Sequence, residues 1–331
     1  MSANIRAASD AAINEAARLL RAGELVAFPT ETVYGLGADA SNPAAMRRLF
    51  EAKGRPSDHP VIVHVADLAA AERWSTGMPA GARALARAYW PGPLTLIVPR
   101  AAGVSDAVTG GQSSVGLRVP SHPVARALLV EFAGGIAAPS ANRFGHVSPT
   151  TAQHVADDLG DAVALILDGG ACDVGIESTI VAFDGEVPML LRPGGIGADA
   201  IAGVLGRAPA TGGASAPRAS GTLASHYAPR TPATLVAKDA LRAELVQLAD
   251  RDERIAVLAR DVAMPEAFDG VWMRAPRAAA EYARALYANL RALDAAGADA
   301  ILIEEVPGEG EWAAVRDRLM RATAGIDDDR D

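Results

Sequence analysis

A lysine and an arginine, two positions apart, stand at the end of a strongly signalled helix. Residues 43–53 are predicted to be helical because Asn42 can cap the first turn and Gly54 suits a left-handed exit. Lys53 continues the apolar stripe of this helix, and Arg55 follows in the exit loop. An ammonium and a guanidinium in this arrangement favour a clamp for phosphate or carboxylate groups. Pairing with the negative end of the helix dipole is the alternative that spacing alone leaves open.

Two further polar side chains lie within apolar runs. The run 61–65 is apolar on both faces, as in a central strand, and carries His64 near its far end. A ligand contact and a satisfied core histidine both remain open for His64, and no metal-ligand spacing is recognised among the six histidines. Arg118 interrupts the run 115–119, where a guanidinium is costly unless it is paired. Its partner would be a substrate carboxylate or an internal one.

Other apolar runs end in small polar residues. Such clusters put hydrogen-bonding groups at the carboxyl edge of a sheet, where open α/β folds bind ligands. Ser or Thr before a helix leaves backbone N–H groups free for phosphate oxygens. Ordinary polar turns and helix capping are the alternatives. The clusters are Thr30-Glu31-Thr32 after 25–28, Ser140 and Asn142 after 136–138, Ser148 before the helix at 151–159, and Ser178 before 179–183.

Short β-type runs alternate with helical patterns through residue 205. This alternation predicts an α/β fold with a twisted mixed or parallel sheet covered by helices. The expected strands are 25–28, 61–65, 94–98, 115–119, 136–138, 164–167, 179–183 and 189–191, and the expected helices are 10–22, 43–53, 79–89, 122–133 and 151–159.

The composition changes at residues 207–232, where Gly, Ala, Ser and Pro dominate, as is typical of a linker. A second α/β pattern follows, with strands at 235–237, 255–258 and 301–303 and helices at 239–249, at 277–296 and from 311. We therefore expect a first domain at 8–200, a linker at 201–232 and a small Rossmann-like domain at 233–325.

Chain length, net charge and cysteine content limit the classes of protein to which this sequence can belong. The 331 residues suffice for two domains. A net charge of −9 disfavours a nonspecific nucleic-acid binder, which needs a basic surface. The single cysteine, Cys172, excludes an internal disulfide and a thiolate metal cluster. We recognise no secretory signal pattern and no apolar run near the roughly 18 residues of a membrane span, so we expect a cytoplasmic protein without membrane contact.

Taken in order, the motifs resemble those of the YrdC-type threonylcarbamoyladenylate synthases, in the long form with a C-terminal extension. The matching segments keep the family order over roughly residues 10–230, which makes the set more specific than any single motif. They are PTETVYGLG, the Lys-x-Arg of Lys53 and Arg55, HPVIVHV, WPGPLTLIV, VGLRVPSHP, APSAN, GIESTIV, LLRPGGI and SHYAP.

The resemblance implies a YrdC-like fold around an open ligand cavity and a nucleotidyltransferase activity. L-Threonine, bicarbonate and ATP would give threonylcarbamoyl-AMP, pyrophosphate and water, for N6-threonylcarbamoyladenosine at tRNA position 37. No enzyme nucleophile is needed if a carbamate of threonine attacks the α-phosphate. Catalysis would then rest on Lys53, Arg55 and a Mg²⁺ ion held mainly through the ATP phosphates.

The family's ligand contacts carry over by position. Arg118 would hold the threonine carboxylate, and the backbone at Ala138 would meet its amino end. His59 stands where the family often has Asn. The implied threonine contacts are Thr32, His64, Arg118, Ala138 and Ser178. The implied ATP contacts are Lys53, Arg55, His59, Ser114, Ser140, Asn142, Ser148, Arg192 and Tyr227.

The resemblance also implies partners, namely downstream proteins that transfer the threonylcarbamoyl group to tRNA, without strong direct nucleic-acid binding. It further implies that the linker folds over the nucleotide pocket as a lid, whereas composition alone favours a tether. A carbamoyltransferase-type maturation factor and an RNA-binding module of the same fold are the competing functions.

Overall fold

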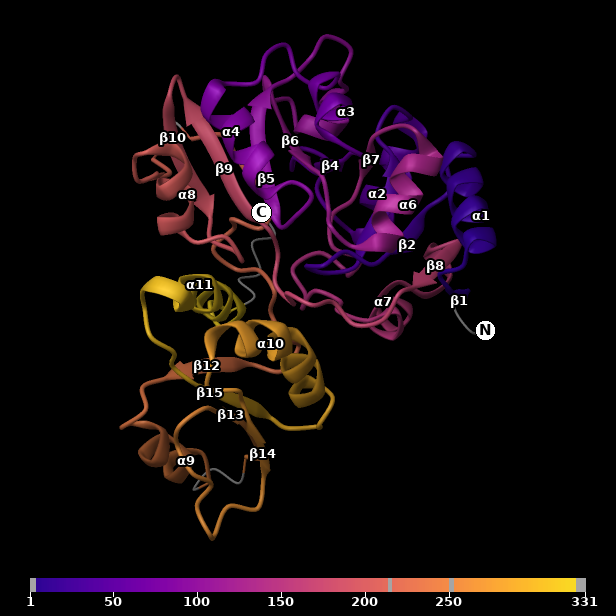
Figure 1. The fold of residues 1–331 in the computed structure, drawn as a ribbon. Helices are drawn as coiled ribbons and strands as arrows, with labels where there is room; N and C mark the ends of the chain where they lie inside the picture. Colours follow the sequence, from indigo (N-terminus) through magenta and orange to yellow (C-terminus); the bar gives the residue numbers. More distant parts are fainter. Residues whose placement is uncertain (1–3, 214–215, 250–252, 326–331) are drawn as a thin grey trace. The chain divides into compact units, whose positions relative to one another are not determined.

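The computed structural model describes residues 4–213, 216–249 and 253–325, which form two compact units (Figure 1). The described residues of Met1–Phe144 and Pro149–Thr222 make the first unit. Those of Gly145–Ser148 and Leu223–Asp331 make the second. The chain therefore enters the second unit twice, briefly at residues 145–148 and again from Leu223.

The described residues of the first unit form an 11-stranded mixed sheet in the order β1-β8-β2-β3-β7-β4-β6-β5-β9-β10-β11. The predicted α/β class is confirmed. The strands are β1 Ile5–Ala7, β2 Val26–Phe28, β3 Gly35–Asp39, β4 Ile62–His64, β5 Leu94–Pro99, β6 Ser114–Arg118, β7 Ile136–Ala137, β8 Leu165–Asp168, β9 Thr179–Asp184, β10 Val187–Arg192 and β11 Ala210–Thr211.

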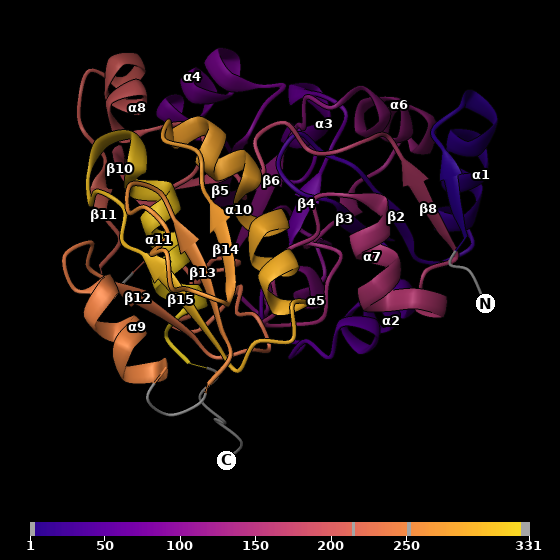
Figure 2. The ribbon, with the colours of Figure 1, turned by 90° about the horizontal axis from the view of Figure 1, so that it is seen from below.

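Helices cover both faces of this sheet. On one face α1 and α6 lie side by side and bury Leu20 and Leu128 against Val26 and Leu165 of the sheet (Figures 1 and 2). On the other face α2, α4 and α7 contribute to a second, larger core. The helices are α1 Asp10–Arg21, α2 Pro43–Lys53, α3 Leu68–Glu72, α4 Ala80–Tyr89, α5 Asp106–Thr109, α6 Pro123–Phe132, α7 Ala152–Leu159 and α8 Ala198–Leu205, with a 3₁₀ turn at Gly160–Ala162.

The register of β4 and β6 aligns two of the residues expected to act in the site. These strands run parallel, and His64 lies opposite Arg118 in the pairing. Each residue is the last of its strand. Because the carboxyl ends of parallel strands meet at one edge of a sheet, His64 and Arg118 lie side by side at that edge.

Helix α2 begins and ends as predicted. The Asn42 side chain accepts the N–H groups of Ala44 and Ala45, at 2.9 and 3.2 Å. Gly54 closes the helix with φ of 62°, a left-handed conformation that glycine adopts without strain. The apolar stripe is buried, and Lys53 at its end is only 2% exposed. The helix therefore delivers an ammonium group into the interior of the first unit.

Strand β3 was not predicted, because its sequence suggested only a glycine-punctuated turn. It pairs antiparallel with β2, opposite Val26–Phe28. A Cβ atom at Gly37 would lie 2.9 Å from the Phe28 ring and 3.0 Å from the Val26 carbonyl oxygen. The glycine thus permits a close strand approach that a side chain would block. β1, β11, α3, α5 and α8 were also not predicted.

Residues 201–205 of the predicted linker are helical, as the end of α8. Gly197 precedes this helix, Gly206 ends it in the left-handed conformation, and Ile201 is buried. Farther on, β11 pairs in parallel with β10. The predicted boundary between the first domain and the linker, at residue 201, therefore falls inside a packed helix of the first unit.

The second unit contains a four-stranded, all-parallel sheet in its described residues, with the order β12-β15-β13-β14. The expected Rossmann-like class of this domain is confirmed, although β14 was not predicted. The elements are β12 Ala233–Val236, α9 Leu241–Ala249, β13 Ile255–Ala259, β14 Val271–Arg274, α10 Ala279–Asp294, β15 Ala300–Glu304, a 3₁₀ turn at Gly310–Trp312 and α11 Ala313–Ala322. Among the described helices, none is both long and apolar enough to cross a bilayer.

An internal carboxylate binds the backbone donors at the carboxyl edge of this second sheet. Glu304, the last residue of β15, accepts the N–H groups of Arg260, Asp261 and Val262 at one oxygen, at 2.8, 2.9 and 3.1 Å. Successive backbone N–H groups at a strand end are typical of anion sites in such folds. Here the protein supplies the anion itself.

Candidate functional site

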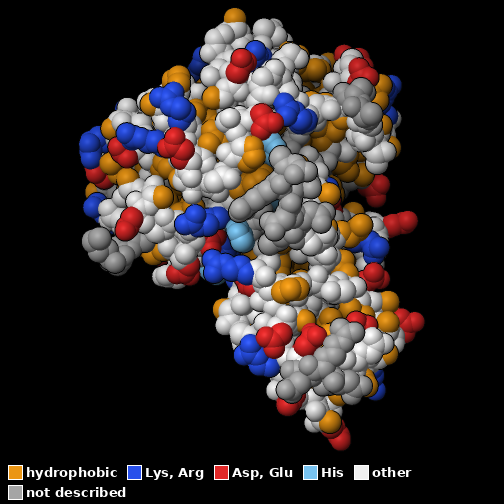
Figure 3. Space-filling model, turned by 180° about the vertical axis from the view of Figure 1, so that it is seen from behind, with side chains coloured by type: hydrophobic (Ala, Val, Ile, Leu, Met, Phe, Trp, Pro, Cys, Tyr) orange, Lys and Arg blue, Asp and Glu red, His pale blue; other side chains and the backbone are white. Residues whose placement is uncertain are grey.

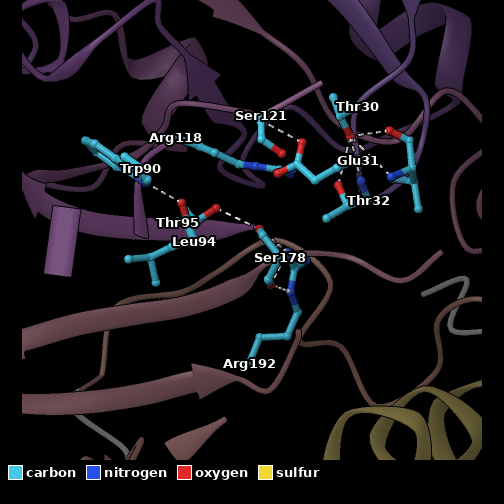
Figure 4. Close-up of polar contacts among 11 residues, drawn as sticks. Thr30, Glu31, Thr32, Trp90, Leu94, Thr95, Arg118, Ser121, Ser178 and Arg192 are labelled. Atoms are coloured by element: carbon cyan, nitrogen blue, oxygen red, sulfur yellow. Dashed lines mark hydrogen bonds and ion pairs between the residues drawn. The ribbon is translucent and has the colours of Figure 1, made fainter. Parts of the chain in front are cut away.

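The turn after β2 is held by Thr30, a member of the predicted polar cluster that was not among the expected ligand contacts. Thr30 Oγ1 donates to the carbonyl oxygen of Val33 at 2.6 Å and accepts the N–H groups of Thr32 and Val33 at 3.2 Å (Figure 4). The two hydroxyls of Thr30 and Thr32 lie 2.8 Å apart. This side-chain turn fixes Thr32 in a fully buried position. A Thr-x-Thr after an apolar strand was the available signal.

Arg118 forms a buried ion pair with Glu31 of the same turn. Its Nη2 lies 2.7 Å from Glu31 Oε1, and the Ser121 N–H donates to Glu31 Oε2 at 3.0 Å (Figure 4). Burial raises the pKa of Glu31, but the charge and hydrogen bond of Arg118 hold that pKa below its ordinary value. The internal partner left open by the sequence is therefore present.

The pair with Glu31 does not use all the donors of Arg118. The Nε atom of Arg118 is buried and has no hydrogen-bond partner among residues 4–213, 216–249 and 253–325. An unpaired buried donor is unfavourable, and a second carboxylate would satisfy it.

His64 is buried beside Arg118 and is neutral. Its ring packs edge-on against Phe28, with centroids 6.3 Å apart. Burial, helped by the Arg118 charge, lowers the pKa of His64 to about 3. Its Nδ1 atom has no hydrogen-bond partner within the part of the chain that the structure describes. A neutral imidazole in this position can accept or donate a hydrogen bond without adding charge.

Ser178 precedes β9 and joins two other residues of the site. Its hydroxyl lies 2.8 Å from that of Thr95 on β5 (Figure 4). Arg192, at the end of β10, donates to the Ser178 carbonyl oxygen from Nε and Nη2 at 3.1 and 3.0 Å. Its Nη1 donates to the Ser220 carbonyl oxygen at 2.7 Å. Arg192 thus connects the start of β9 to the segment that precedes the second unit.

Lys53 meets the loop that carries Ser140 and Asn142. Its Nζ lies 2.5 Å from the carbonyl oxygens of both residues. Burial, together with the nearby charge of Arg55, lowers the pKa of Lys53 well below its ordinary value. An ammonium held by carbonyl dipoles in a dry environment would gain a great deal from a phosphate oxygen.

Arg55 lies in a second small cluster. It donates to the Pro60 carbonyl oxygen at 2.9 Å and lies 3.5 Å from the Ser220 hydroxyl. Its guanidinium stacks over the Phe144 ring, 5.4 Å from the centroid, and the His59 ring contacts the same phenyl edge-on. Burial and the Arg55 charge lower the pKa of His59. A neutral imidazole beside a buried guanidinium again leaves the cationic charge with the arginine.

The segment before the second unit lies over the strands of the first. The Arg218 N–H donates to the Gln112 side chain at 2.7 Å, and Gln112 donates back to the Arg218 carbonyl oxygen at 3.1 Å. A small cavity of about 20 Å³ lies beside this segment, with Ser114 and Ser220 in its lining. Sequence composition gave no signal for these contacts, because small residues dominate the segment.

Most of the expected site residues belong to the first unit. Ala138 follows β7 directly, and its N–H donates to the Ile62 carbonyl oxygen at 3.0 Å. Ser148 and Tyr227 instead belong to the second unit, and both are buried there. The residues placed in the first unit are Thr32, Lys53, Arg55, His59, His64, Ser114, Arg118, Ala138, Ser140, Asn142, Ser178 and Arg192.

Buried His64 makes the free energy of unfolding depend on pH. Because the folded pKa of His64 is about 3 and the ordinary value is 6.5, only the unfolded chain binds this proton between the two values. The stability that neutral His64 contributes is fully present above pH 6.5, the pKa in the unfolded chain. It is lost as the pH falls towards about 3, the pKa in the folded protein. We expect His64→Gln to reduce the slope of unfolding free energy against pH, near pH 5, by about 1.4 kcal/mol per pH unit. Urea unfolding at several pH values measures the slope, and equal slopes in both proteins would contradict the buried neutral state.

Comparisons with known proteins agree with this arrangement. Residues 18–194 match the family described as Telomere recombination, and residues 196–324 match the family described as Threonylcarbamoyl-AMP synthase, C-terminal domain. A threonylcarbamoyl-AMP synthase of Bacillus subtilis is 42% identical over 326 residues, covering 96% of this chain and 94% of the relative. One from Pyrococcus abyssi is 39% identical over 322 residues, covering 94% of each.

The fold is also similar to that of a solved structure. The crystal structure of P. abyssi Sua5 complexed with L-threonine matches with a TM-score of 0.88 at 36% identity, over 97% of this chain and 96% of that one. The resemblance carried by the ordered motifs is therefore confirmed over both domains. This chain belongs to the threonylcarbamoyl-AMP synthase family, in its long two-domain form.

Proposed function

We propose that this protein makes threonylcarbamoyl-AMP and pyrophosphate from L-threonine, bicarbonate and ATP, in the cytoplasm, for the modification of tRNA. The observation that carries the proposal is a set of four cations in the first unit, each at most 7% exposed: Lys53, Arg55, Arg118 and Arg192. Buried cations on this scale suit substrates that bring several negative charges, as a triphosphate and an amino-acid carboxylate do.

The threonine half of the site would lie around Arg118. Its buried Nε is the donor available to a carboxylate, while Glu31 orients the guanidinium from the other side. His64 is neutral and can hydrogen-bond the substrate without repelling its amino group. The hydroxyls of Thr32 and Ser178 and the backbone at Ala138 would complete the contacts.

The ATP half would use the other cations. Lys53 and Arg55 would neutralise charge on the phosphates, assisted by Arg192 and by the loop of Ser140 and Asn142. His59, Ser114, Ser148 and Tyr227 remain predicted ATP contacts. Within the described residues, no group of three or more His, Cys, Asp or Glu is placed to hold a metal ion. As the family resemblance implies, Mg²⁺ would be held mainly by the phosphate oxygens, where it would neutralise developing charge.

The chemistry needs positioning more than an enzyme nucleophile. The amino group of threonine and bicarbonate condense to a carbamate and release water. A carbamate oxygen then attacks the α-phosphate, and the bond to pyrophosphate breaks. Burial raises the pKa of the Cys172 thiol to about 12, so this cysteine is not a thiolate near neutral pH. The side chains bind and orient the reactants and stabilise the phosphate charge.

The product would pass to proteins that transfer the threonylcarbamoyl group to tRNA. On the face drawn in Figure 3, the acidic and basic side chains of the described residues are interspersed rather than gathered into one basic patch. This distribution and the net charge of −9 favour delivery of the adenylate over tight tRNA binding by this chain. An RNA-binding module would need the opposite charge balance.

The segment 216–222 would act as the lid over the first unit. Its Ser220 already accepts from Arg192 and lies within reach of Arg55, two residues expected to bind ATP. Nucleotide binding would then exchange these contacts for contacts with phosphate. Exclusion of water by such a segment would protect a hydrolysable acyl-adenylate.

Pyrophosphate release tests the proposal. Release should require threonine, bicarbonate and ATP together, and each omission should abolish it.

Lys53→Ala and Arg55→Ala should each lose most activity, since a charge-assisted phosphate contact contributes on the order of 2–4 kcal/mol in the transition state. Arg48→Ala is the matched control, because Arg48 lies on the same helix and pairs with Glu24 at the surface. Normal turnover by both site variants would refute the assignment.

Arg118→Lys tests the threonine half separately. Lysine keeps the charge opposite Glu31 but lacks the second donor of the fork, so threonine binding should weaken about tenfold or more while ATP binding changes little. Arg100→Lys serves as a control, since Arg100 pairs with Asp106 at the surface. Calorimetric titration with each ligand decides the question, and equal losses for threonine and ATP would make Arg118 purely structural.

A further inference from the structure

One face of helix α10 contacts both stretches at which the chain enters the second unit. Tyr287, Arg291 and Asp294 are spaced by four and three residues, so they share a face of the helix. One stretch is 145–148, which ends at Ser148. The other begins at Leu223 and contains Tyr227. Ser148 and Tyr227 are the two predicted ATP contacts that lie in the second unit.

Arg291 holds the first stretch by its backbone. Its Nη2 donates to the carbonyl oxygen of Val147, and its Nε lies 3.4 Å from that of Ser148. A guanidinium that reaches two successive carbonyl groups fixes the peptide between them, and an ammonium cannot reproduce this fork. The position of Ser148 is thus set from α10.

Tyr287 packs against the second stretch at Tyr227. The two rings lie 5.7 Å apart, and the guanidinium of Arg318 lies 5.4 Å from the Tyr227 ring centroid. Tyr227 is 1% exposed and has φ of 65°, a left-handed conformation that a bulky side chain rarely adopts. Such a conformation persists only where the surroundings over-determine it.

The two stretches also bind each other. The Ala228 N–H donates to the Gly145 carbonyl oxygen at 2.9 Å, and His146 and Ala228 form a parallel bridge. Just beyond, the Thr231 N–H donates to Asp294 on the same helix face, at 2.8 Å. Two turns of one helix therefore hold the paired stretches that carry Ser148 and Tyr227.

We propose that Tyr287 and Arg291 are positioning residues for ATP: they fix Ser148 and Tyr227 in one relative arrangement through the backbone of the two stretches. The inference rests on the proposed function, because the ATP contacts of Ser148 and Tyr227 belong to it. It assigns the second unit a definite task, which is to supply a rigid helix as the common support of two nucleotide-contacting segments.

The test compares substrates and uses the full-length protein. Arg291→Leu and Tyr287→Ala should each raise the KM for ATP by about tenfold and change the KM for threonine by less than about twofold, because only ATP contacts are displaced. Tyr287→Phe keeps the ring that packs against Tyr227, so it should raise the KM for ATP less than Tyr287→Ala does. Arg277→Ala is the matched control, since Arg277 is an exposed arginine of the same unit paired with Asp261.

Hydrogen exchange supplies a readout that needs no activity. The Ala228 amide should exchange faster in Arg291→Leu and Tyr287→Ala than in the wild type or in Arg277→Ala, because its bond to Gly145 depends on the support from α10. If the wild type released no pyrophosphate, the proposed function would fail, while faster exchange at Ala228 would still support the positioning role.

Two outcomes would overturn the inference. Unchanged exchange at Ala228 in both variants would mean that α10 does not fix the two stretches. Equal increases in the KM values for ATP and threonine, accompanied by a lower melting temperature, would mean that Tyr287 and Arg291 only stabilise the fold.

Discussion

The structure depends on how the first unit stabilises four buried cations. A buried cation is costly unless hydrogen bonds or an opposite charge compensate it. Arg118 has a carboxylate, Glu31, whereas Lys53 and Arg192 are held by main-chain carbonyl oxygens. Carbonyl dipoles do not neutralise the charge of Lys53, so this group would favour an anionic substrate. Burial, together with the nearby charge of Arg55, lowers the pKa of Lys53.

The loops of the site follow from this constraint. The Ser140–Asn142 loop turns its carbonyl groups towards Lys53, and the residues before β9 turn theirs towards Arg192. The Thr30 turn places Glu31 where it meets Arg118, which lies 87 residues further along the chain. Polar strand ends, which in sequence resemble ordinary turns, are thus shaped by the charges they compensate.

The sequence predicted the local parts of this site and not the long-range pairs. Helix 43–53 was predictable because its caps and apolar stripe agree, and this agreement placed Lys53 at the interior end of the helix. Arg118 could be recognised as needing a partner, but Glu31 could not be chosen as that partner without the fold. Thr95 was missed because it sits within an apolar strand, and β3 was missed because its glycines resemble turn residues.

The segment between the domains shows that amino-acid composition alone does not predict which residues pack against a domain. Small residues at 207–232 indicated only a linker, because they lack the periodicity that reveals packed elements. In the structure, residues 216–222 belong to the first unit and Leu223 onward to the second. His226 and Tyr227 were the visible exception, as aromatic rings among small residues, and both are buried within the second unit. Their support on α10 depends on contacts more than 50 residues apart in sequence, such as that between Tyr227 and Tyr287.

The central claim is that the buried cations bind the phosphates of ATP. Proton uptake on ATP binding tests this claim most directly. A phosphate beside Lys53 should raise its lowered pKa, so ATP binding at alkaline pH should be accompanied by proton uptake. The Cys172 thiol, whose pKa is raised to about 12, does not interfere. Calorimetry in buffers of different ionisation enthalpy counts the protons. We predict uptake in the wild type that disappears in Lys53→Met, and ATP binding without proton uptake in the wild type would contradict the account.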